Sequence, residues 1–228
     1  MSEPRTPADI VRFPREFPNL KNAIKADSPV RIIAVGSSST AGREDILPYP
    51  SWLQWALRRA HEHKTIDVIN RGVGGEDAPE ELERLKQAAA EKPAMIIWQV
   101  GTNAIFHADR YVGGQVAAAI ENGLDAICTP EIDVLVMDLQ YAPALLRPEK
   151  KTATQALAKQ IAEIVAARPD RSLQLFPRFA LMQHWHEIDG ISFDRMTDPT
   201  DGDRLHQSEW STRAVAQALC DALGDAVK

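Results

Sequence analysis

The sequence predicts a three-layer α/β/α sandwich built around a central, about five-stranded parallel sheet. From residue 30 onward, short apolar runs alternate with longer amphipathic stretches, which is typical of repeated β-α units. The apolar runs are almost continuous in Ile, Val, Leu and Met, as expected for strands that are covered on both faces. This alternation continues to the C-terminus, so one architecture accounts for nearly the whole chain.

The individual elements follow from the spacing of apolar residues. We expect strands at residues 31–35, 66–70, 95–100, 133–138 and 172–176. We expect helices at residues 51–63, 79–91, 113–127, 148–167 and 208–223. The last helix illustrates the reasoning, because apolar residues recur in it every four positions and would face the sheet: Trp210, Ala214, Ala218 and Ala222.

The chain divides into an N-terminal arm and one domain. Prolines at positions 4, 7, 14 and 18 break up residues 1–29, so this segment is predicted to be an arm packing on the core, with one helical turn at residues 20–25. The remaining residues, 30–228, are predicted to form a single domain, since one α/β domain of this length is ordinary and buries a large core.

Composition and charge exclude several classes of protein. Apolar residues make up 44% of the chain and charged residues 25%, which indicates a folded globular protein. A net charge of -6 without a cluster of Lys and Arg argues against a nucleic-acid partner. The two cysteines, Cys128 and Cys220, are expected to be core residues and indicate neither a disulfide framework nor a metal site.

Apolar runs are too short for targeting or membrane insertion. The first residues lack the apolar segment of a secretory signal. No stretch approaches the roughly 20 apolar residues that span a bilayer. We therefore expect no membrane span and a cytoplasmic location.

Function is expected in the loops that follow the strands, because open parallel sheets bind ligands beyond the carboxyl ends of their strands. The loop after the first strand, residues 36–42, holds three serines between glycines. Such a loop turns tightly and presents hydroxyl and N–H groups. Taken alone, it is as consistent with an ordinary polar turn as with a catalytic or anion-binding loop. It matches neither a P-loop nor the Gly-x-Ser-x-Gly elbow.

Two more loops reach the same edge of the predicted sheet. Residues 70–75, Asn-Arg-Gly-Val-Gly-Gly, follow the second strand and would let a carbonyl oxygen or phosphate approach the main chain. Residues 101–104, Gly-Thr-Asn-Ala, follow the third strand and bring an uncharged donor, Asn103. Each alone is also compatible with a plain turn.

The fourth feature lies before the last helix. Asp203 and His206 are three residues apart, a spacing that brings two side chains together across one helical turn. A carboxylate that binds one ring nitrogen leaves the other free to take a proton from a serine. An ordinary surface pair before a helix is the alternative.

Together the four segments resemble the sequence blocks of the SGNH hydrolases, also called GDSL-like esterases and lipases. Residues 36–40 are similar to the Gly-Asp-Ser-x-Thr block, which implies that Ser38 is the nucleophile. Asp203 and His206 fit the final block, which implies that these two residues complete a catalytic triad with Ser38. The resemblance implies an oxyanion hole formed by Ser38, Gly75 and Asn103, and a flavodoxin-like fold.

The chain departs from the family pattern at two positions. Ser37 stands where the family has Asp, and Ala104 stands where the third block has its second Asp. In the family these residues support loop geometry by hydrogen bonding. Their loss leaves the reaction type unchanged and concerns the rate and the exact loop conformation.

The resemblance implies a serine esterase that hydrolyses carboxylic esters, with short-chain acyl or acetyl groups, through an acyl-enzyme intermediate. The expected partner is a small-molecule or saccharide ester, with no nucleic acid. No cofactor and no metal are expected. Four histidines, at positions 61, 63, 184 and 186, are expected to face solvent, and His107 to lie at the rim. The alternative function is a catalytically weak or inactive module that binds carbohydrate or an anion.

Overall fold

The structure, a computed structural model, describes residues 7–43, 45–111, 114–169 and 172–227. Its centre is a sheet of five parallel strands in the order β2-β1-β3-β4-β5, the strand order of flavodoxin-like sheets. The predicted fold class is confirmed. Each strand ends within one or two residues of its predicted limits: β1 Val30–Gly36, β2 Ile66–Gly72, β3 Met95–Gln99, β4 Asp133–Met137 and β5 Leu173–Phe176.

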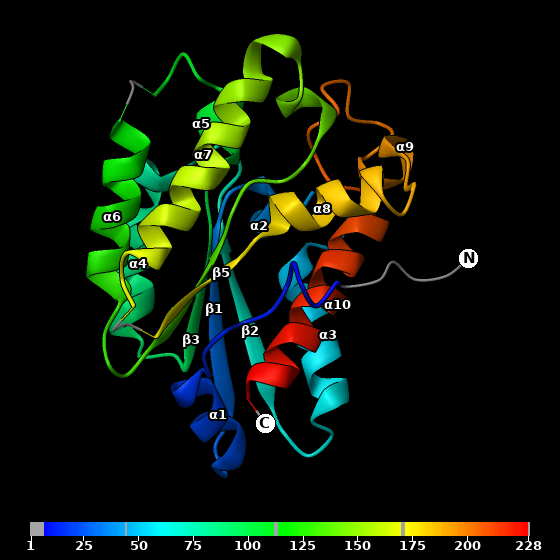
Figure 1. Cartoon of the computed structure of the whole chain (residues 1–228). Helices are drawn as coiled ribbons and strands as arrows, with labels where there is room; N and C mark the ends of the chain where they lie inside the picture. The colour runs from blue at the N-terminus through cyan, green and yellow to red at the C-terminus, as the bar shows by residue number, and fades with distance from the viewer. Residues whose placement is uncertain (1–6, 44, 112–113, 170–171, 228) are drawn as a thin grey trace.

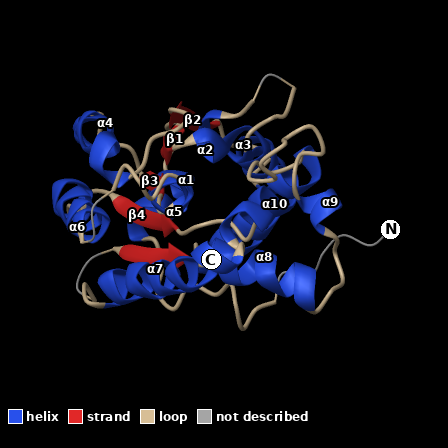
Figure 2. Ribbon diagram, turned by 90° about the horizontal axis from the view of Figure 1, so that it is seen from above, coloured by secondary structure: helices blue, strands red, loops and turns tan. Residues whose placement is uncertain are grey.

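Helices cover both faces of the sheet (Figure 1). One layer contains α4, α6 and α7, and the opposite layer contains α3, α10 and α8, as the view from above also shows (Figure 2). The predicted start of α6, at residue 113, lies outside the described residues. The bounds of these helices are α3 Tyr49–Ala60, α4 Ala78–Ala90, α6 Gln115–Ile127, α7 Pro148–Ala166, α8 Arg178–Glu187 and α10 Glu209–Ala226.

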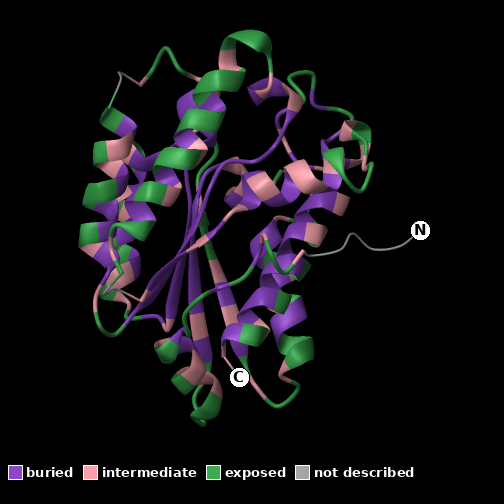
Figure 3. Ribbon diagram, viewed as in Figure 1, coloured by how far each residue is buried: buried purple, intermediate pink, exposed green. Residues whose placement is uncertain are grey.

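Burial follows from this layering (Figure 3). Every residue of β3 and β4 is buried, because these strands lie inside the sheet with helices on both faces. β2 is an edge strand, and its burial falls off toward its carboxyl end. Both cysteines are buried, as predicted.

The segment before the sheet packs on the core through both apolar and polar contacts. Val11, Phe13 and Phe17 are buried. The side chain of Gln174 on β5 binds both main-chain groups of Arg15, accepting from its N–H at 3.1 Å and donating to its carbonyl at 2.7 Å. Helix α1 (Pro18–Lys25) follows, and the carboxylate of Asp133 accepts from the N–H of Leu20 at 2.8 Å. Residues 1–6 lie outside the described part of the arm.

Short helices complete the chain. α2 (Ser38–Ala41) and α5 (Thr102–Phe106) begin directly beyond β1 and β3, at the carboxyl edge of the sheet (Figure 1). A 3-10 turn, η1 (Pro143–Leu145), follows β4, and α9 (Phe193–Met196) follows α8. Helix α8 was not predicted from the sequence, although Leu181, Met182 and Trp185 lie buried on it at helical spacing. The same buried stripe opens with Arg178, and a charged residue hides an apolar pattern.

Candidate active site

Ser38 is the first residue of α2, the single helical turn that leaves β1. Ser37 caps this turn: its carbonyl accepts from the N–H groups of Thr40 and Ala41 at 2.9 and 2.8 Å. Ser38 is only partly buried, whereas Ser37 and Thr40 on either side are buried. The turn therefore fixes its neighbours in the core and leaves the Ser38 side chain access to the surface.

Two side-chain amides from neighbouring strands hold this turn. Gln99, at the end of β3, accepts through Oε1 from the N–H of Ser37 at 3.1 Å and from its hydroxyl at 2.9 Å. Asn70, on β2, donates through Nδ2 to the carbonyl of Thr40 at 2.6 Å. The turn also lies so close to β2 that a Cβ added to Gly72 would come within 2.2 Å of the main-chain nitrogen of Ala41. Only glycine permits this approach.

The loop after β2 brings two glycines to the same place. Gly75 has a φ of +83°, in the left-handed region that favours glycine. A Cβ on Gly74 would lie 3.9 Å from the Cβ of Ser38. The predicted donor Gly75 is thus one residue along the chain from the glycine that directly borders Ser38.

Asn103 lies on α5 and is 3% exposed. Its Nδ2 donates to the carbonyl of Glu76 at 2.8 Å, which ties the loop after β3 to the loop after β2. An amide NH₂ carries two hydrogens, so this bond leaves one donor of Asn103 for another acceptor.

Asp77 is a second link between these two loops, and the sequence analysis did not identify it. It caps α4, and its carboxylate accepts from the N–H groups of Ala78, Gly101 and Ala104 at 2.8, 2.9 and 2.9 Å. Burial raises the pKa of Asp77, and these hydrogen bonds act in the opposite direction. The signal in the sequence was Asp77-x-x-Glu80, a capping box that the structure contains.

The two departures from the family pattern have local substitutes. The hydroxyl of Ser37 takes part in supporting its loop through Gln99. At Ala104, which has no carboxylate, the main-chain N–H binds Asp77 instead. Both loops therefore keep a hydrogen-bonded support.

His206 binds Asp201, and this corrects the expected pairing with Asp203. Nδ1 of His206 lies 2.9 Å from Oδ2 of Asp201, and the same oxygen accepts from the N–H groups of Leu205 and His206 at 2.9 and 2.7 Å. Asp203 is exposed, and its main-chain N–H points to Oδ1 of Asp201 at 3.3 Å. The spacing rule assumed a helical turn. Arg204 instead has a φ of +55°, so the chain turns back there.

The hydrogen bonds to Asp201 stabilise its charged form. Burial pushes the pKa of Asp201 upward, but the bonds from His206 and Leu205 outweigh it, and the pKa falls below its ordinary value. An ionised acceptor at Nδ1 keeps the proton on that nitrogen. Nε2 of His206 is then the nitrogen that can accept a proton.

The loop that carries His206 is closed at its base. Thr197 and Gln207 form an isolated antiparallel bridge, and the N–H of Asp198 donates to the carbonyl of His206 at 2.9 Å. Arg43, one residue beyond the loop of Ser38 (residues 36–42), reaches this loop. Its Nη1 lies 3.3 Å from Oδ2 of Asp198 and 3.1 Å from Nδ1 of His206. Since a guanidinium only donates, Arg43 stabilises the loop through its carboxylates.

Ser38 and His206 meet in one small pocket, which Arg43, Ile46 and Pro48 also line. The two residues thus line the same pocket although 168 residues separate them in the sequence. Gly75 and Asn103 belong to the two loops that adjoin Ser38 at this edge of the sheet.

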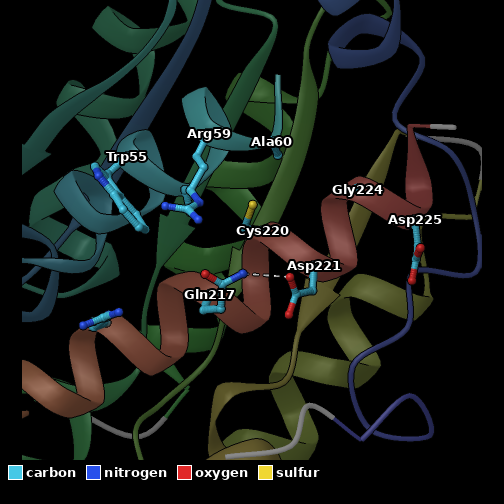
Figure 4. Close-up of a pocket in the computed structure, with 10 residues that line it drawn as sticks. Trp55, Arg59, Ala60, Gln217, Cys220, Asp221, Gly224 and Asp225 are labelled. Carbon is cyan, nitrogen blue, oxygen red and sulfur yellow. Dashed lines mark hydrogen bonds between the residues drawn. The ribbon is translucent and has the colours of Figure 1, made fainter. Parts of the chain in front are cut away.

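A separate groove lies between α3 and α10 (Figure 4). Trp55 and Arg59 line one side, and Gln217, which donates to Asp221 at 2.8 Å, lies on the other. The groove shares no lining residue with the pocket at Ser38. None of the predicted site residues lines this groove.

His206 is the one histidine among the described residues that line the pocket at Ser38. His184 and His186 are partly buried, which differs from the expected solvent-facing position, because α8 packs here and the ring of His186 stacks on Phe193 at 3.8 Å. Within the described ranges, no group of three or more His, Cys, Asp and Glu side chains is placed to hold a metal ion. Across the same residues, no helix combines the length and apolar character that a membrane crossing requires.

Comparison with known proteins gives a family and a set of similar folds. The model of the Non-GDSL lipase-like family matches residues 3–228, so it includes most of the N-terminal arm. No curated protein sequence matches the chain.

Among solved structures, a catalytic mutant of Axe2, an acetylxylan esterase from Geobacillus stearothermophilus, is similar with a TM-score of 0.72 and 15% identity, covering 88% of this chain and 96% of that one. LAE5, an alpha/beta hydrolase enzyme from the metagenome of Lake Arreo in Spain, has a TM-score of 0.70 and 14% identity, with 88% and 98% covered. At identities of 14–15%, these similarities concern the fold alone.

Proposed function

The chain belongs to the Non-GDSL lipase-like family, and from this premise we propose that it is a serine esterase of the SGNH type. The observation that carries the proposal is the pocket shared by Ser38 and His206, with the second ring nitrogen of His206 bound to the carboxylate of Asp201. Asp201 therefore replaces Asp203 as the proposed third member of the triad.

The reaction begins when Nε2 of His206 takes the proton of the Ser38 hydroxyl as its oxygen attacks the ester carbonyl. The tetrahedral intermediate carries a negative oxygen. We assign its donors as the N–H of Ser38, at the start of α2, the N–H of Gly75 and the second hydrogen of Asn103. Collapse passes the proton from His206 to the leaving alcohol and leaves an acyl-serine.

Hydrolysis of the acyl-serine completes the cycle. His206 takes a proton from water, the hydroxide attacks the acyl carbonyl, and the Ser38 oxygen leaves with that proton. The products are one carboxylic acid and one alcohol. No cofactor or metal takes part in these steps.

We propose esters with short acyl groups, acetyl above all, as substrates. The pocket at Ser38 is small and is lined on one side by Ile46 and Pro48, which leaves little room for a long acyl chain. Axe2, which has a similar fold, is an acetylxylan esterase. This supports a saccharide as the alcohol part of the ester.

Hydrolysis of p-nitrophenyl acetate by wild type and by Ser38→Ala tests the mechanism. We expect Ser38→Ala to lose activity and to lose labelling by a fluorophosphonate, which reacts with activated serines. Asn103→Ala should reduce kcat by about 100- to 1,000-fold, the usual effect of removing one oxyanion donor. Equal activity of wild type and Ser38→Ala would contradict the serine mechanism and favour a binding module.

A further inference from the structure

Gln140 lies just beyond β4 at the carboxyl edge of the sheet and is 1% exposed. Its side-chain amide makes two hydrogen bonds in opposite directions. Oε1 accepts from the hydroxyl of Ser39 at 3.0 Å, and Nε2 donates to the carbonyl of Leu205. Ser39 is adjacent to Ser38, and Leu205 is adjacent to His206. One buried side chain therefore joins the loop of the nucleophile to the loop of the base.

The chemistry of the two partners fixes the orientation of this amide. A carbonyl oxygen only accepts, so the NH₂ group must face Leu205. The amide oxygen then faces Ser39, whose hydroxyl can donate. Neither methionine nor leucine can make both bonds, and glutamate lacks the donor that Leu205 needs. A glutamine is the side chain that satisfies both loops.

Ser38 and His206 lie on loops far apart in the sequence. Their spacing therefore depends on side chains that connect the two loops, such as Arg43 and Gln140. Arg43 contacts the His206 loop from the side, and it is exposed. Gln140 is buried and makes one hydrogen bond to each of the two loops. A buried bond of this kind holds its partners more rigidly than an exposed ion pair does.

We propose that Gln140 is a positioning residue that sets the separation between the Ser38 hydroxyl and Nε2 of His206. This inference rests on the proposed serine mechanism. Gln140 contacts neither reacting group, and it acts through Ser39 and Leu205. Because a shift of about 1 Å between reacting groups can cost about 100-fold in rate, a small movement of either loop lowers kcat.

Gln140→Met tests the proposal, since methionine fills a similar volume and makes neither bond. With p-nitrophenyl acetate we expect kcat to fall by about 10- to 100-fold, while KM stays close to that of wild type. Hydrogen exchange at the main-chain N–H groups of Leu205 and His206 should become faster, because their loop has lost its link to the core. This second measurement does not depend on catalysis.

Gln174→Met is the matched control. Gln174 is also a glutamine of the sheet, is 3% exposed, and likewise uses both ends of its amide to bind another segment, at Arg15. It lies away from Ser38 and His206. We expect Gln174→Met to keep the kcat of wild type and the exchange rates of the His206 loop, so loss of a buried glutamine alone would not explain an effect of Gln140→Met.

Ser39→Ala removes only one of the two bonds and is the second variant, should Gln140→Met fail to fold. It should lower kcat with KM unchanged, and it should add little when combined with Gln140→Met, because both changes break the same link. Equal kcat values for Gln140→Met and Gln174→Met, or an unchanged kcat for Ser39→Ala, would overturn the inference. Failure of the serine mechanism itself would instead appear as equal activity in wild type and Ser38→Ala.

Discussion

The loops that carry Ser38 and His206 are built in opposite ways. The nucleophile loop, residues 36–42 around the proposed nucleophile Ser38, is held by neutral amides of neighbouring strands, Gln99 and Asn70. The base loop, residues 197–207, is held by carboxylates of its own, Asp198 and Asp201. The nucleophile loop therefore depends on side chains of the sheet, whereas main-chain N–H groups of the base loop depend on carboxylates within that loop.

This difference follows from where each loop lies. The nucleophile loop is a single turn directly beyond a central strand, so side chains of adjacent strands reach it. The base loop is a longer segment between α9 and α10, and the sheet edge reaches it through Gln140, which donates to the carbonyl of Leu205. Its main-chain N–H groups need acceptors, and Asp198 and Asp201 supply them from within. We therefore expect changes in charge to affect the base loop far more than the nucleophile loop.

The largest effect is expected for Asp201→Asn. The uncharged amide no longer holds the proton on Nδ1 of His206, and loss of the corresponding Asp in a serine-protease triad costs about 10⁴-fold in kcat. We expect a fall of this order with p-nitrophenyl acetate. Asp203→Asn changes the neighbouring carboxylate in the same way and should leave kcat within about twofold of wild type, as for most exposed substitutions.

Reversal of these two results would restore the original pairing of Asp203 with His206. The sequence places both carboxylates near His206, in Asp201-Gly202-Asp203, and a helical spacing favoured the nearer one. The choice depends on the backbone of Arg204, whose left-handed conformation turns the chain so that Asp201 faces the ring. No local pattern predicts that conformation in an arginine.

The sheet was easier to predict than the links between loops. Five apolar runs are nearly sufficient to predict the strands and their common carboxyl edge. They therefore also predict that the loops of Ser38, Gly75 and Asn103 leave the same edge of the sheet. Buried polar residues were the difficulty. Gln99 and Gln140 are ordinary polar positions in the sequence, and the capping box of Asp77 does not reveal its bonds to the loop after β3, because the partners come from distant segments. Arg178 hid helix α8 for a different reason, because its charge conceals the apolar stripe to which it belongs.

A smaller effect is expected for Gln99→Met, which tests the nucleophile loop. Methionine leaves the buried N–H and hydroxyl of Ser37 without their acceptor, and each such group costs about 1–3 kcal/mol. We expect the free energy of unfolding in urea to fall by about 2–3 kcal/mol and kcat to fall less than in Asp201→Asn. A stability equal to that of wild type would mean that Gln99 does not support this loop.

The smallest effect concerns pH and separates the two loops directly. The pKa of Asp201 is lower in the folded protein than its ordinary value of 3.8, so its contribution to stability is present above that value and is lost as pH falls through the folded pKa. Between pH 5 and about 2.5, wild type should lose stability more steeply than Asp201→Asn, whose residue 201 does not titrate. The free energy of unfolding of Gln99→Met should be lower than that of wild type at each pH and should change in parallel with it, because the amide that is removed binds no proton in this range. Urea unfolding curves of the three proteins at each pH measure these slopes, and a Gln99→Met curve that converged with wild type at low pH would show that the nucleophile loop also depends on ionised groups.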